Sequence, residues 1–446
     1  MYKNLSYSLR WNAIESLFYN GVMLVHQMAL FAVLDRAQYG LLGALFGILY
    51  LCVHIFNFGL DGFFAFNFSR LSSNRSIWSR YVITQICLLA ITFVFLSPLV
   101  GIYVYYYFPI ERLSVPVLLM CALILEGIKK TFRTILQLAL ENRTSTLIEV
   151  FFLGMYMLIV WSAYAIKIKL SIAFLLGALA FCSLLANVLL VYAVYSWSRF
   201  LPSGVPSDSW HFLAICYTRL VFTFNQLVHQ VFSTNFLVPL FVHTGGMSYG
   251  ALFKIVSTVT QFFSIFMQKI VGITAEALFA VYEKAGIDSR KLAFSSVLRS
   301  ICHMIYGAFI FFCINTKDIL LFNGVDLSGT LWLVAFAFFF LYSFETLLVN
   351  CEKWFFLQAR FNFIFLFNFF TVLALLGIFC LSRYIYLSPQ FILAMLLIIR
   401  VCGFIFLGTY LRNIYNISAL WLPKLNYVFI SVAFSLLVKF AIYLVS

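Results

Sequence analysis

Charged side chains recur inside the long apolar stretches of this sequence. The bases are Lys129, Lys130, Arg133, Arg219, Lys254, Lys269, Arg299, Arg400 and Lys439, and the acids are Glu15, Asp61, Glu126, Glu149, Glu276 and Glu345. A charge facing lipid at the centre of a bilayer costs roughly 2.5–3.5 kcal/mol, and the sum exceeds a typical folding stability of roughly 5–15 kcal/mol. Most of these groups are therefore expected to face protein or a water-filled cavity, or to snorkel to the membrane surface.

The cations could bind an anion such as a diphosphate, because arginine and lysine are common phosphate-binding side chains. Arg219 and Lys254 are predicted to line a substrate cavity. A cluster on one helical face is formed by Lys129, Lys130 and Arg133. This cluster is either a cationic entrance to the cavity or a helix end that follows the positive-inside bias. Arg400 lies deeper in its stretch, and Glu345 is its proposed partner.

Uncharged polar side chains recur at helical spacing and are predicted to line the same cavity. They are Asn12, Ser16, Asn20, Gln27, Asn57, Thr223, Gln226, Gln230 and Gln261. The alternative is that they only join neighbouring helices, at about 0.6 kcal/mol per contact. Candidates for ion coupling are Glu15, Asp61, His26 and Glu276, because a carboxylate in low dielectric can exchange a proton near neutral pH. Structural salt bridges to Arg219 or Lys254 remain the alternative for the acids.

The composition identifies the elements that hold these residues as membrane-spanning helices. Of the 446 residues, 64% are hydrophobic and 10% are charged, and the mean hydropathy is +1.02. Soluble domains are about 45–50% apolar and about 25% charged. A soluble fold cannot hide so much apolar surface, whereas helices of about 20 apolar residues can present it to lipid. The ten cysteines show neither disulfide nor metal-ligand spacing, so no metal site is expected.

Apolar runs separated by charged or turn-rich breaks predict an all-α polytopic bundle of 12–13 transmembrane helices. The predicted spans are 12–34, 40–68, 81–108, 114–138, 145–166, 170–196, 213–242, 250–282, 292–314, 330–350, 361–382, 389–411 and 425–445. Lysine and arginine are more frequent in alternate loops, which favours a cytoplasmic N-terminus. The formal net charge of +14 follows from this bias and does not indicate nucleic-acid binding.

Two segments 210 residues apart (249 − 39) resemble each other and indicate a duplication. FAVLDRAQYGLLGALFGILYLCVHIFNFGLDGFFA aligns with FVHTGGMSYGALFKIVSTVTQFFSIFMQKIVGITA, which matches Tyr39–Gly40 with Tyr249–Gly250 and Gly62 with Gly272. Glycine at these points would permit a tight turn and a close helix approach. The hypothesis is a parallel repeat of two pseudo-symmetric six-helix halves around a central cavity; chance similarity between apolar segments is the alternative.

The halves are predicted at 1–196 and 213–412, joined by a cytoplasmic linker at 197–212 and followed by one additional helix in 413–446. The loops are too short to hold a further domain, and the sequence has no Walker motif and no large external catalytic loop. We therefore expect a protein that is not an enzyme and that needs no cofactor.

The turn LDRAQYGLLGALFGILYL resembles the start of the bacterial polysaccharide and O-antigen flippases. These belong to the multidrug/oligosaccharidyl-lipid/polysaccharide exporter superfamily. TFRTILQLALENRTSTLIEVF and NCEKWFFLQARFNFIFLFN resemble the inner turns of that family after its fourth and tenth helices. The resemblance implies two six-helix bundles that flip undecaprenyl-diphosphate-linked sugars by alternating access. The high phenylalanine content and the single extra C-terminal helix depart from the family pattern.

The resulting hypothesis is an inner-membrane flippase for a lipid-linked oligosaccharide, such as an O-antigen unit of lipopolysaccharide. Its expected partners are this substrate, membrane lipids, a polysaccharide polymerase machinery and a proton or sodium ion, with no nucleic acid. A drug or metabolite antiporter of the same superfamily remains open, as does a membrane-embedded polysaccharide polymerase or ligase. Basic residues in the spans favour an anionic cargo over a cationic drug, and the short external loops disfavour a polymerase. The charges within the spans also argue against a purely structural scaffold.

Overall fold

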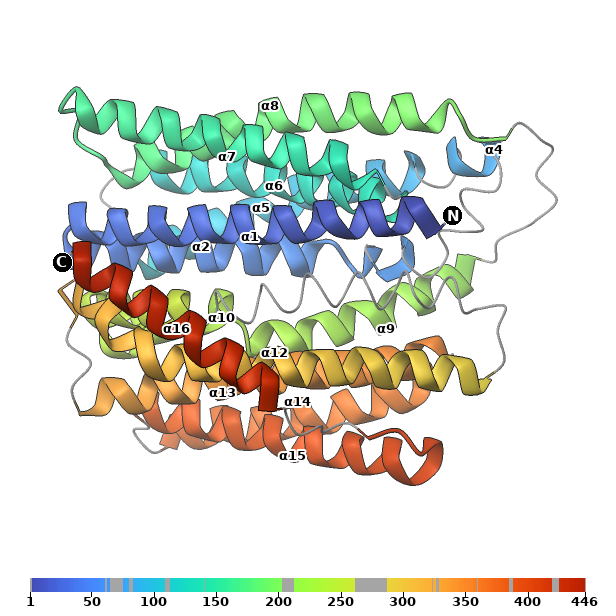
Figure 1. Cartoon of the computed structure of the whole chain (residues 1–446). Coiled ribbons are helices and arrows are strands. Elements are labelled where there is room, and N and C mark those ends of the chain that lie inside the picture. Colours follow the sequence, from blue (N-terminus) through green and yellow to red (C-terminus); the bar gives the residue numbers. More distant parts are fainter. Residues whose placement is uncertain are drawn as a thin grey trace. The chain divides into compact units, whose positions relative to one another are not determined.

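The computed structural model confirms an all-helical bundle (Figure 1). It describes all residues except 1, 61, 65–74, 80–82, 109–112, 140, 203–211, 261–286, 323, 326–328, 359, 385–387, 419–424 and 446. In the described part of the chain, seven helices are long and apolar enough to cross a membrane. The chain is therefore a multi-pass membrane protein.

The first of two compact units comprises Met1–Trp11, Leu41–Val231 and Asn235–Pro239. Its described helices include most of α2 (Arg36–Phe56), α4 (Arg75–Ile77), α5 (Ile83–Tyr107), α6 (Ser114–Leu138), α7 (Asn142–Ala165), α8 (Ile172–Ser198) and α9 (Phe212–Val231). Helix α6 packs against α5, α7 and α8, and α7 also packs against α8 (Figure 1). This packing places the charged face of α6 beside its neighbours.

The second unit comprises Asn12–Gly40, Phe232–Thr234 and Leu240–Ser446. It holds most of α1 (Tyr2–Val33) and α10 (Thr234–Gly245), helical residues 247–260, α12 (Ile287–Phe322), α13 (Thr330–Leu357), α14 (Phe361–Tyr384), α15 (Pro389–Tyr415) and α16 (Leu425–Val445). The most extensive packing joins α12 to α16 and α13 to α15. The added C-terminal helix is thus a packed part of this unit.

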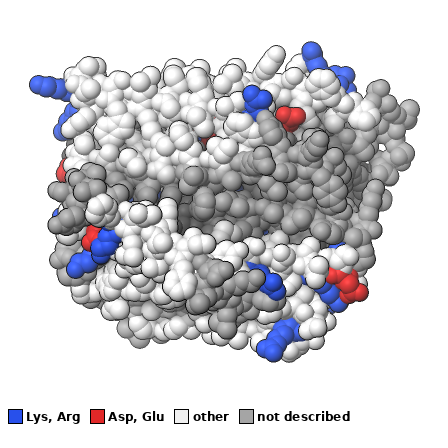
Figure 2. All heavy atoms as spheres, viewed as in Figure 1, with Lys and Arg blue, Asp and Glu red and all other residues white. Residues whose placement is uncertain are grey.

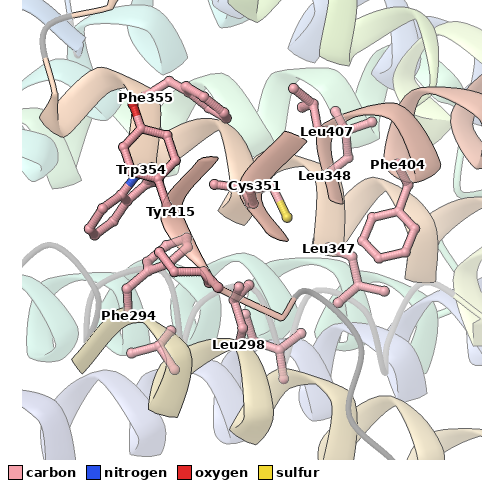
Figure 3. Close-up of a cluster of buried hydrophobic side chains, with 14 of the residues drawn as sticks. Phe294, Leu298, Leu347, Leu348, Cys351, Trp354, Phe355, Phe404, Leu407 and Tyr415 are labelled. Carbon is pink, nitrogen blue, oxygen red and sulfur yellow. The ribbon is translucent and has the colours of Figure 1, made fainter. Parts of the chain in front are cut away.

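A cluster of buried aromatic and aliphatic side chains joins α12, α13 and α15 within the second unit (Figure 3). The Trp354 ring of α13 lies 5.0 Å from the Phe294 ring of α12 and 5.6 Å from the Tyr415 ring of α15. Leu348 and Leu407 complete the contact between α13 and α15. Burying one large apolar side chain contributes about 1.5–3 kcal/mol, so this cluster fixes three helices around one centre.

Large apolar side chains also cover the outside of both units. Phe95 of α5 is 74% exposed and Leu437 of α16 is 67% exposed. Among the described residues on the face in Figure 2, charged side chains are few and are separated by uncharged areas. In water such a surface would aggregate, whereas in a bilayer it is the surface that contacts lipid.

Local capping signals set several helix ends. The Ser171 hydroxyl accepts a hydrogen bond of 3.2 Å from the backbone N–H of Phe174 at the start of α8. The Ser388 hydroxyl does the same for Phe391 at 3.3 Å, with Pro389 in the first turn of α15. Such caps satisfy backbone N–H groups that lack a partner within the helix. They explain why the predicted start of the span at 389 agrees with the structure.

The predicted bounds of α6 and α16 agree with the structure, but two predicted spans are interrupted. The span predicted at 40–68 breaks after Phe56, where Phe58 and Gly59 adopt positive φ angles of 45° and 66°. The span predicted at 213–242 breaks before Thr234, where Ser233 is extended. Polar residues stand at both points, Asn57 at the first and Gln230 and Ser233 at the second, but their spacing also fits the polar face of an unbroken helix, so periodicity alone could not locate the breaks.

The glycines of the Tyr-Gly pairs both stand at close approaches, as expected. A Cβ added to Gly40 would lie 2.0 Å from the backbone oxygen of Met247, at the start of helical residues 247–260. A Cβ added to Gly250 would lie 2.1 Å from Cγ2 of Val242 in α10. A larger residue would displace the backbone at Gly40 and the Val242 side chain at Gly250. The duplication itself stays a prediction.

Candidate functional site

A buried ion pair lies at the centre of the α6 face. The Lys129 ammonium is 2.7 Å from Oε1 of Glu126, and Lys129 is 5% exposed. The Ser183 hydroxyl of α8 donates a hydrogen bond to the same carboxylate oxygen. The ammonium also lies 3.4 Å from the centroid of the Phe152 ring in α7. The charge of Lys129 is therefore neutralised inside the first unit by groups from three helices.

The two other predicted cations of α6 also have partners within the first unit. The Lys130 ammonium is 2.7 Å from Nδ1 of His54 in α2, and a nitrogen of Arg133 is 3.7 Å from Oε1 of Glu149 in α7. Lysine can only donate, so His54 Nδ1 is the acceptor in this contact. The structure thus brings Lys129, Lys130 and Arg133 together and ties each to a neighbouring helix. The cationic entrance stays a prediction.

Arg219 of α9 binds the broken end of α2. Its Nε donates to the carbonyl oxygen of Phe58 at 3.0 Å, and its Nη2 donates to that of Asn57 at 3.2 Å. The Asn57 carbonyl oxygen also accepts a hydrogen bond of 3.1 Å from the backbone N–H of Leu60, so the guanidinium adds a second, charge-assisted donor there and supplies one to the Phe58 carbonyl beyond the end of the helix. The side chain is half-buried. Arg219 therefore fixes the position of the α2 break relative to α9.

Glycines allow α9 to approach this break closely. A Cβ added to Gly59 would lie 2.4 Å from the backbone oxygen of Arg219, and one added to Gly62 would meet the Phe222 ring at 2.5 Å. Because Gly59 also has a positive φ, any other residue there is strained. The guanidinium of Arg219 and these two glycines together define one rigid junction within the first unit.

In the second unit, Arg400 of α15 forms the predicted pair with Glu345 of α13. Its Nε is 2.5 Å from Oε2, and its Nη2 donates to Oε1 at 3.3 Å, so the contact is bidentate. The guanidinium also lies 3.6 Å from the centroid of the Phe232 ring. Arg400 is 1% exposed. Such a buried pair has a structural function, because the charge is enclosed by protein.

Lys254 differs from these cations. It lies on helical residues 247–260 and is half-buried. Its ammonium makes no ion pair with any described residue, whereas Lys129 and Arg400 are each paired with a carboxylate. Near it, the Ser257 and Thr258 hydroxyls donate to the Lys254 backbone carbonyl at 2.9 and 2.7 Å. These hydroxyls are satisfied by their own helix, so they do not compensate the ammonium charge.

The predicted polar lining is divided among several environments. Gln27 is buried and its side-chain oxygen accepts a hydrogen bond of 3.2 Å from the Tyr39 hydroxyl. The Thr223 hydroxyl donates to the backbone oxygen of Arg219 at 2.8 Å, and Gln230 accepts a long contact of 3.5 Å from Asn235. These contacts fit the interhelical and local hydrogen bonding that was weighed as the alternative.

The remaining predicted residues are partly described. Asn57 and His26 are buried, whereas Asn20 and Gln226 are half-buried. The Asn57 side-chain amide has no hydrogen-bond partner among the described residues. The predictions for the side chains of Asn12, Glu15 and Ser16, and for Asp61, Gln261 and Glu276, lie outside the described residues.

Sequence reasoning missed the tertiary partners of the α6 cations. His54 and Glu149 were visible as polar residues in apolar stretches, and Ser183 was not singled out. The Glu126–Lys129 spacing of i, i+3 is a signal for a pair on one helix. The contacts with α2, α7 and α8 depend on how the helices pack, which periodicity does not reveal.

Comparisons with known proteins identify the fold. The sequence matches no protein-family profile and no curated protein sequence. The outward-facing conformation of a multidrug resistance MATE family transporter of the MOP superfamily has a TM-score of 0.65 at 14% identity, covering 92% of this chain and 94% of that chain. The inward-facing conformation of a multidrug resistance MATE family transporter of the MOP superfamily has a TM-score of 0.62 at 14% identity. This match covers 91% of this chain and 100% of that chain.

A third solved structure is a MOP superfamily transporter from Pyrococcus furiosus, whose binding pocket is described as having reverse polarity that suggests a different function. It has a TM-score of 0.64 at 12% identity, covering 90% of this chain and 95% of that chain. At these identities the likeness shows the fold. The fold expected from the flippase resemblance is thus confirmed, whereas the polysaccharide branch of the superfamily stays a prediction.

Proposed function

We propose, from the MATE transporter fold of this chain, that it is a membrane transporter that works by alternating access. We further propose that its substrate is an undecaprenyl-diphosphate-linked oligosaccharide, a precursor unit of O-antigen or another surface polysaccharide. In this proposal the chain lies in the inner membrane with a cytoplasmic N-terminus. The substrate moves from the cytoplasmic to the outer leaflet, where a polysaccharide polymerase would use it.

The observation that carries the anionic substrate is that the Lys254 ammonium pairs with no carboxylate among the described residues. An ammonium held away from bulk water is stabilised only by an anion, by hydrogen bonds or by water. Lys129 and Arg400 have carboxylates for this purpose, and Lys254 has none among the described residues. A diphosphate oxygen would supply the missing negative charge. A cationic drug would add a second positive charge and be repelled.

Arg219 is the second cation assigned to the substrate in this proposal. Its hydrogen bonds to the Asn57 and Phe58 carbonyl oxygens hold the guanidinium in one orientation. A guanidinium has five N–H donors in a rigid plane, which suits phosphate oxygens. Fixing the group beforehand lowers the entropy that substrate binding must otherwise overcome.

Each chemical part of the substrate has a proposed place. The diphosphate binds cations, with Lys254 as the principal contact. The sugars contact polar side chains such as Asn20 and Gln226, which are both half-buried. The polyprenyl tail stays in lipid, where its transfer needs no protein contact. Ion coupling by His26, or by a carboxylate among Glu15, Asp61 and Glu276, remains part of the proposal.

Ligand-dependent thermal stabilisation tests the substrate class. The purified protein is heated in detergent with undecaprenyl diphosphate, with undecaprenol or with the cationic dye ethidium. A ligand that binds only the folded state raises the melting temperature according to its affinity. We expect stabilisation by undecaprenyl diphosphate, and little by undecaprenol, which lacks the charge. Equal stabilisation by undecaprenol would contradict a cation-dependent site.

The second candidate is a drug or metabolite antiporter. It is favoured by the fold, since the solved structures include multidrug resistance transporters. This candidate predicts stabilisation by ethidium and none by undecaprenyl diphosphate. It also predicts that Lys254→Gln strengthens ethidium binding, because the substitution removes a repulsive charge.

A further inference from the structure

Two segments of the first unit meet at the end of α8 and carry exposed arginines. The backbone N–H of Arg75 in α4 donates to the carbonyl oxygen of Pro202, just beyond α8, at 2.8 Å. The Trp78 ring packs edge-on against the Trp197 ring, with centroids 4.9 Å apart. Trp78 is buried in this contact. The α4 segment is therefore fastened to the end of α8 at two points.

The second arginine is held by the last turn of α8. The Arg199 guanidinium lies 4.6 Å from the centroid of the Tyr195 ring, and its Nη2 donates to the Tyr195 hydroxyl at 3.0 Å. Arg75 is within electrostatic range of the same hydroxyl. Both arginines are exposed, and neither forms an ion pair with a carboxylate among the described residues.

The length of α8 places this corner at the level of lipid headgroups. Its 27 residues extend about 40 Å at a rise of about 1.5 Å per residue. The hydrocarbon core of a bilayer is only about 30 Å thick. The last turns of α8 therefore emerge among the headgroups. Tyr192, Tyr195 and Trp197 lie in these turns, and tyrosine and tryptophan are the residues enriched at this level.

The local sequence is positively charged without compensation. Segments 75–79 and 192–202 contain two arginines and no acidic residue. Guanidinium groups bind phosphate oxygens through two parallel hydrogen bonds. Aromatic rings next to them would contact the glycerol and upper acyl chain of the same lipid. The loop between α7 and the start of α8 also carries two cations, Lys167 and Lys169, at the other end of α8 from Arg199. In the described structure these lysines have no such contacts with tryptophan or tyrosine.

We propose that Arg75 and Arg199, together with Tyr195 and Trp197, form a binding site for the phosphodiester headgroup of an anionic phospholipid. The site lies within the first unit and is independent of the transported substrate. The single negative charge of a bound phosphodiester would offset half of the positive charge of the two guanidinium groups and strengthen the attachment of α4 to α8. The bilayer surface at this corner is thereby enriched in anionic lipid.

Native mass spectrometry of the full chain tests this site. The protein is equilibrated in mixed micelles that contain phosphatidylglycerol and phosphatidylcholine, and retained lipid is counted for the wild type and for Arg75→Gln/Arg199→Gln. We expect the wild type to prefer phosphatidylglycerol. An attraction of about 1 kcal/mol per cation near an anionic surface corresponds to about 5-fold per arginine, so the double variant should lose about 5- to 30-fold of this preference.

Lys167→Gln/Lys169→Gln is the matched control, because it removes two exposed cations from the loop at the other end of α8. It should keep the preference, and equal losses in both double variants would overturn a specific site. An unchanged preference in Arg75→Gln/Arg199→Gln would also overturn it. Adding glycerol phosphate as a competitor distinguishes a lipid headgroup from a soluble phosphate. If it displaces phosphatidylglycerol at equal concentration, the ligand is a soluble phosphate and the lipid proposal is wrong. Equal melting temperatures in phosphatidylcholine alone establish that the variants fold.

Discussion

The Arg400–Glu345 pair gives the sharpest stability prediction, because both groups are enclosed and their geometry is fixed. Arg400→Met leaves the Glu345 carboxylate buried without its guanidinium. Removing one partner of such a pair costs about 3–5 kcal/mol. The lost contact with the Phe232 ring at 3.6 Å adds to this cost. At about 2 °C per kcal/mol for a large domain, the melting temperature should fall by roughly 6–10 °C.

Substituting the acidic partner instead should lower the stability less. In Glu345→Gln, the Arg400 charge still has the carboxylate of Glu352 within electrostatic range. The double variant Glu345→Gln/Arg400→Met removes both charges and should be more stable than Arg400→Met alone. Thermal unfolding in detergent, followed by tryptophan fluorescence, measures all three variants. Strictly additive effects, or Arg400→Met at the wild-type melting temperature, would refute the assignment of a tightly coupled buried pair.

Two further substitutions test the first unit by the same melting assay. Lys129→Met leaves the Glu126 carboxylate without the ammonium that lies 2.7 Å away and should lower the stability by about 3–5 kcal/mol. The double variant Glu126→Gln/Lys129→Met should recover part of this stability. A double variant less stable than both single variants would contradict this. Gly59→Ala places a Cβ 2.4 Å from the Arg219 oxygen at a φ of 66° and should cost more than about 1–2 kcal/mol. Its control, Gly154→Ala, meets nothing within 4 Å and should be neutral or stabilising by up to about 1 kcal/mol; similar melting temperatures for the two alanine variants would disprove a strained junction.

The sequence was sufficient to predict the helical elements, because a span of about 20 apolar residues is a strong signal. The bounds of α6 and α16 agree with the prediction. The pairing of Arg400 with Glu345 could also be anticipated, since a deep charge requires a partner. Breaks at Gly59 and Ser233 could not be located, because the polar residues around both positions also fit the polar face of an unbroken helix.

The roles of individual cations were harder to predict than their number. Lys129 and Lys254 look alike in the sequence, as each lies in an apolar stretch. Their difference depends on the groups that stand next to each lysine on its own helix. Glu126 stands three residues from Lys129 and pairs with it, whereas Ser257 and Thr258 near Lys254 bond to its backbone. The i, i+3 spacing therefore points to the Glu126–Lys129 pair, whereas no acidic residue stands within four positions of Lys254.

Reconstituted transport by Lys254 variants tests the central claim most directly. Proteoliposomes are loaded with a fluorescent undecaprenyl-diphosphate-linked oligosaccharide, and its appearance in the other leaflet is measured by accessibility to a membrane-impermeant quencher. A hydrogen bond to a charged group contributes about 1.5–3 kcal/mol, so Lys254→Gln should lower transport efficiency by about 10- to 100-fold. Lys254→Arg should keep most activity, and so should Lys439→Gln, whose ammonium is 3.3 Å from Asp318. Wild-type transport in Lys254→Gln, at unchanged stability, would contradict the account.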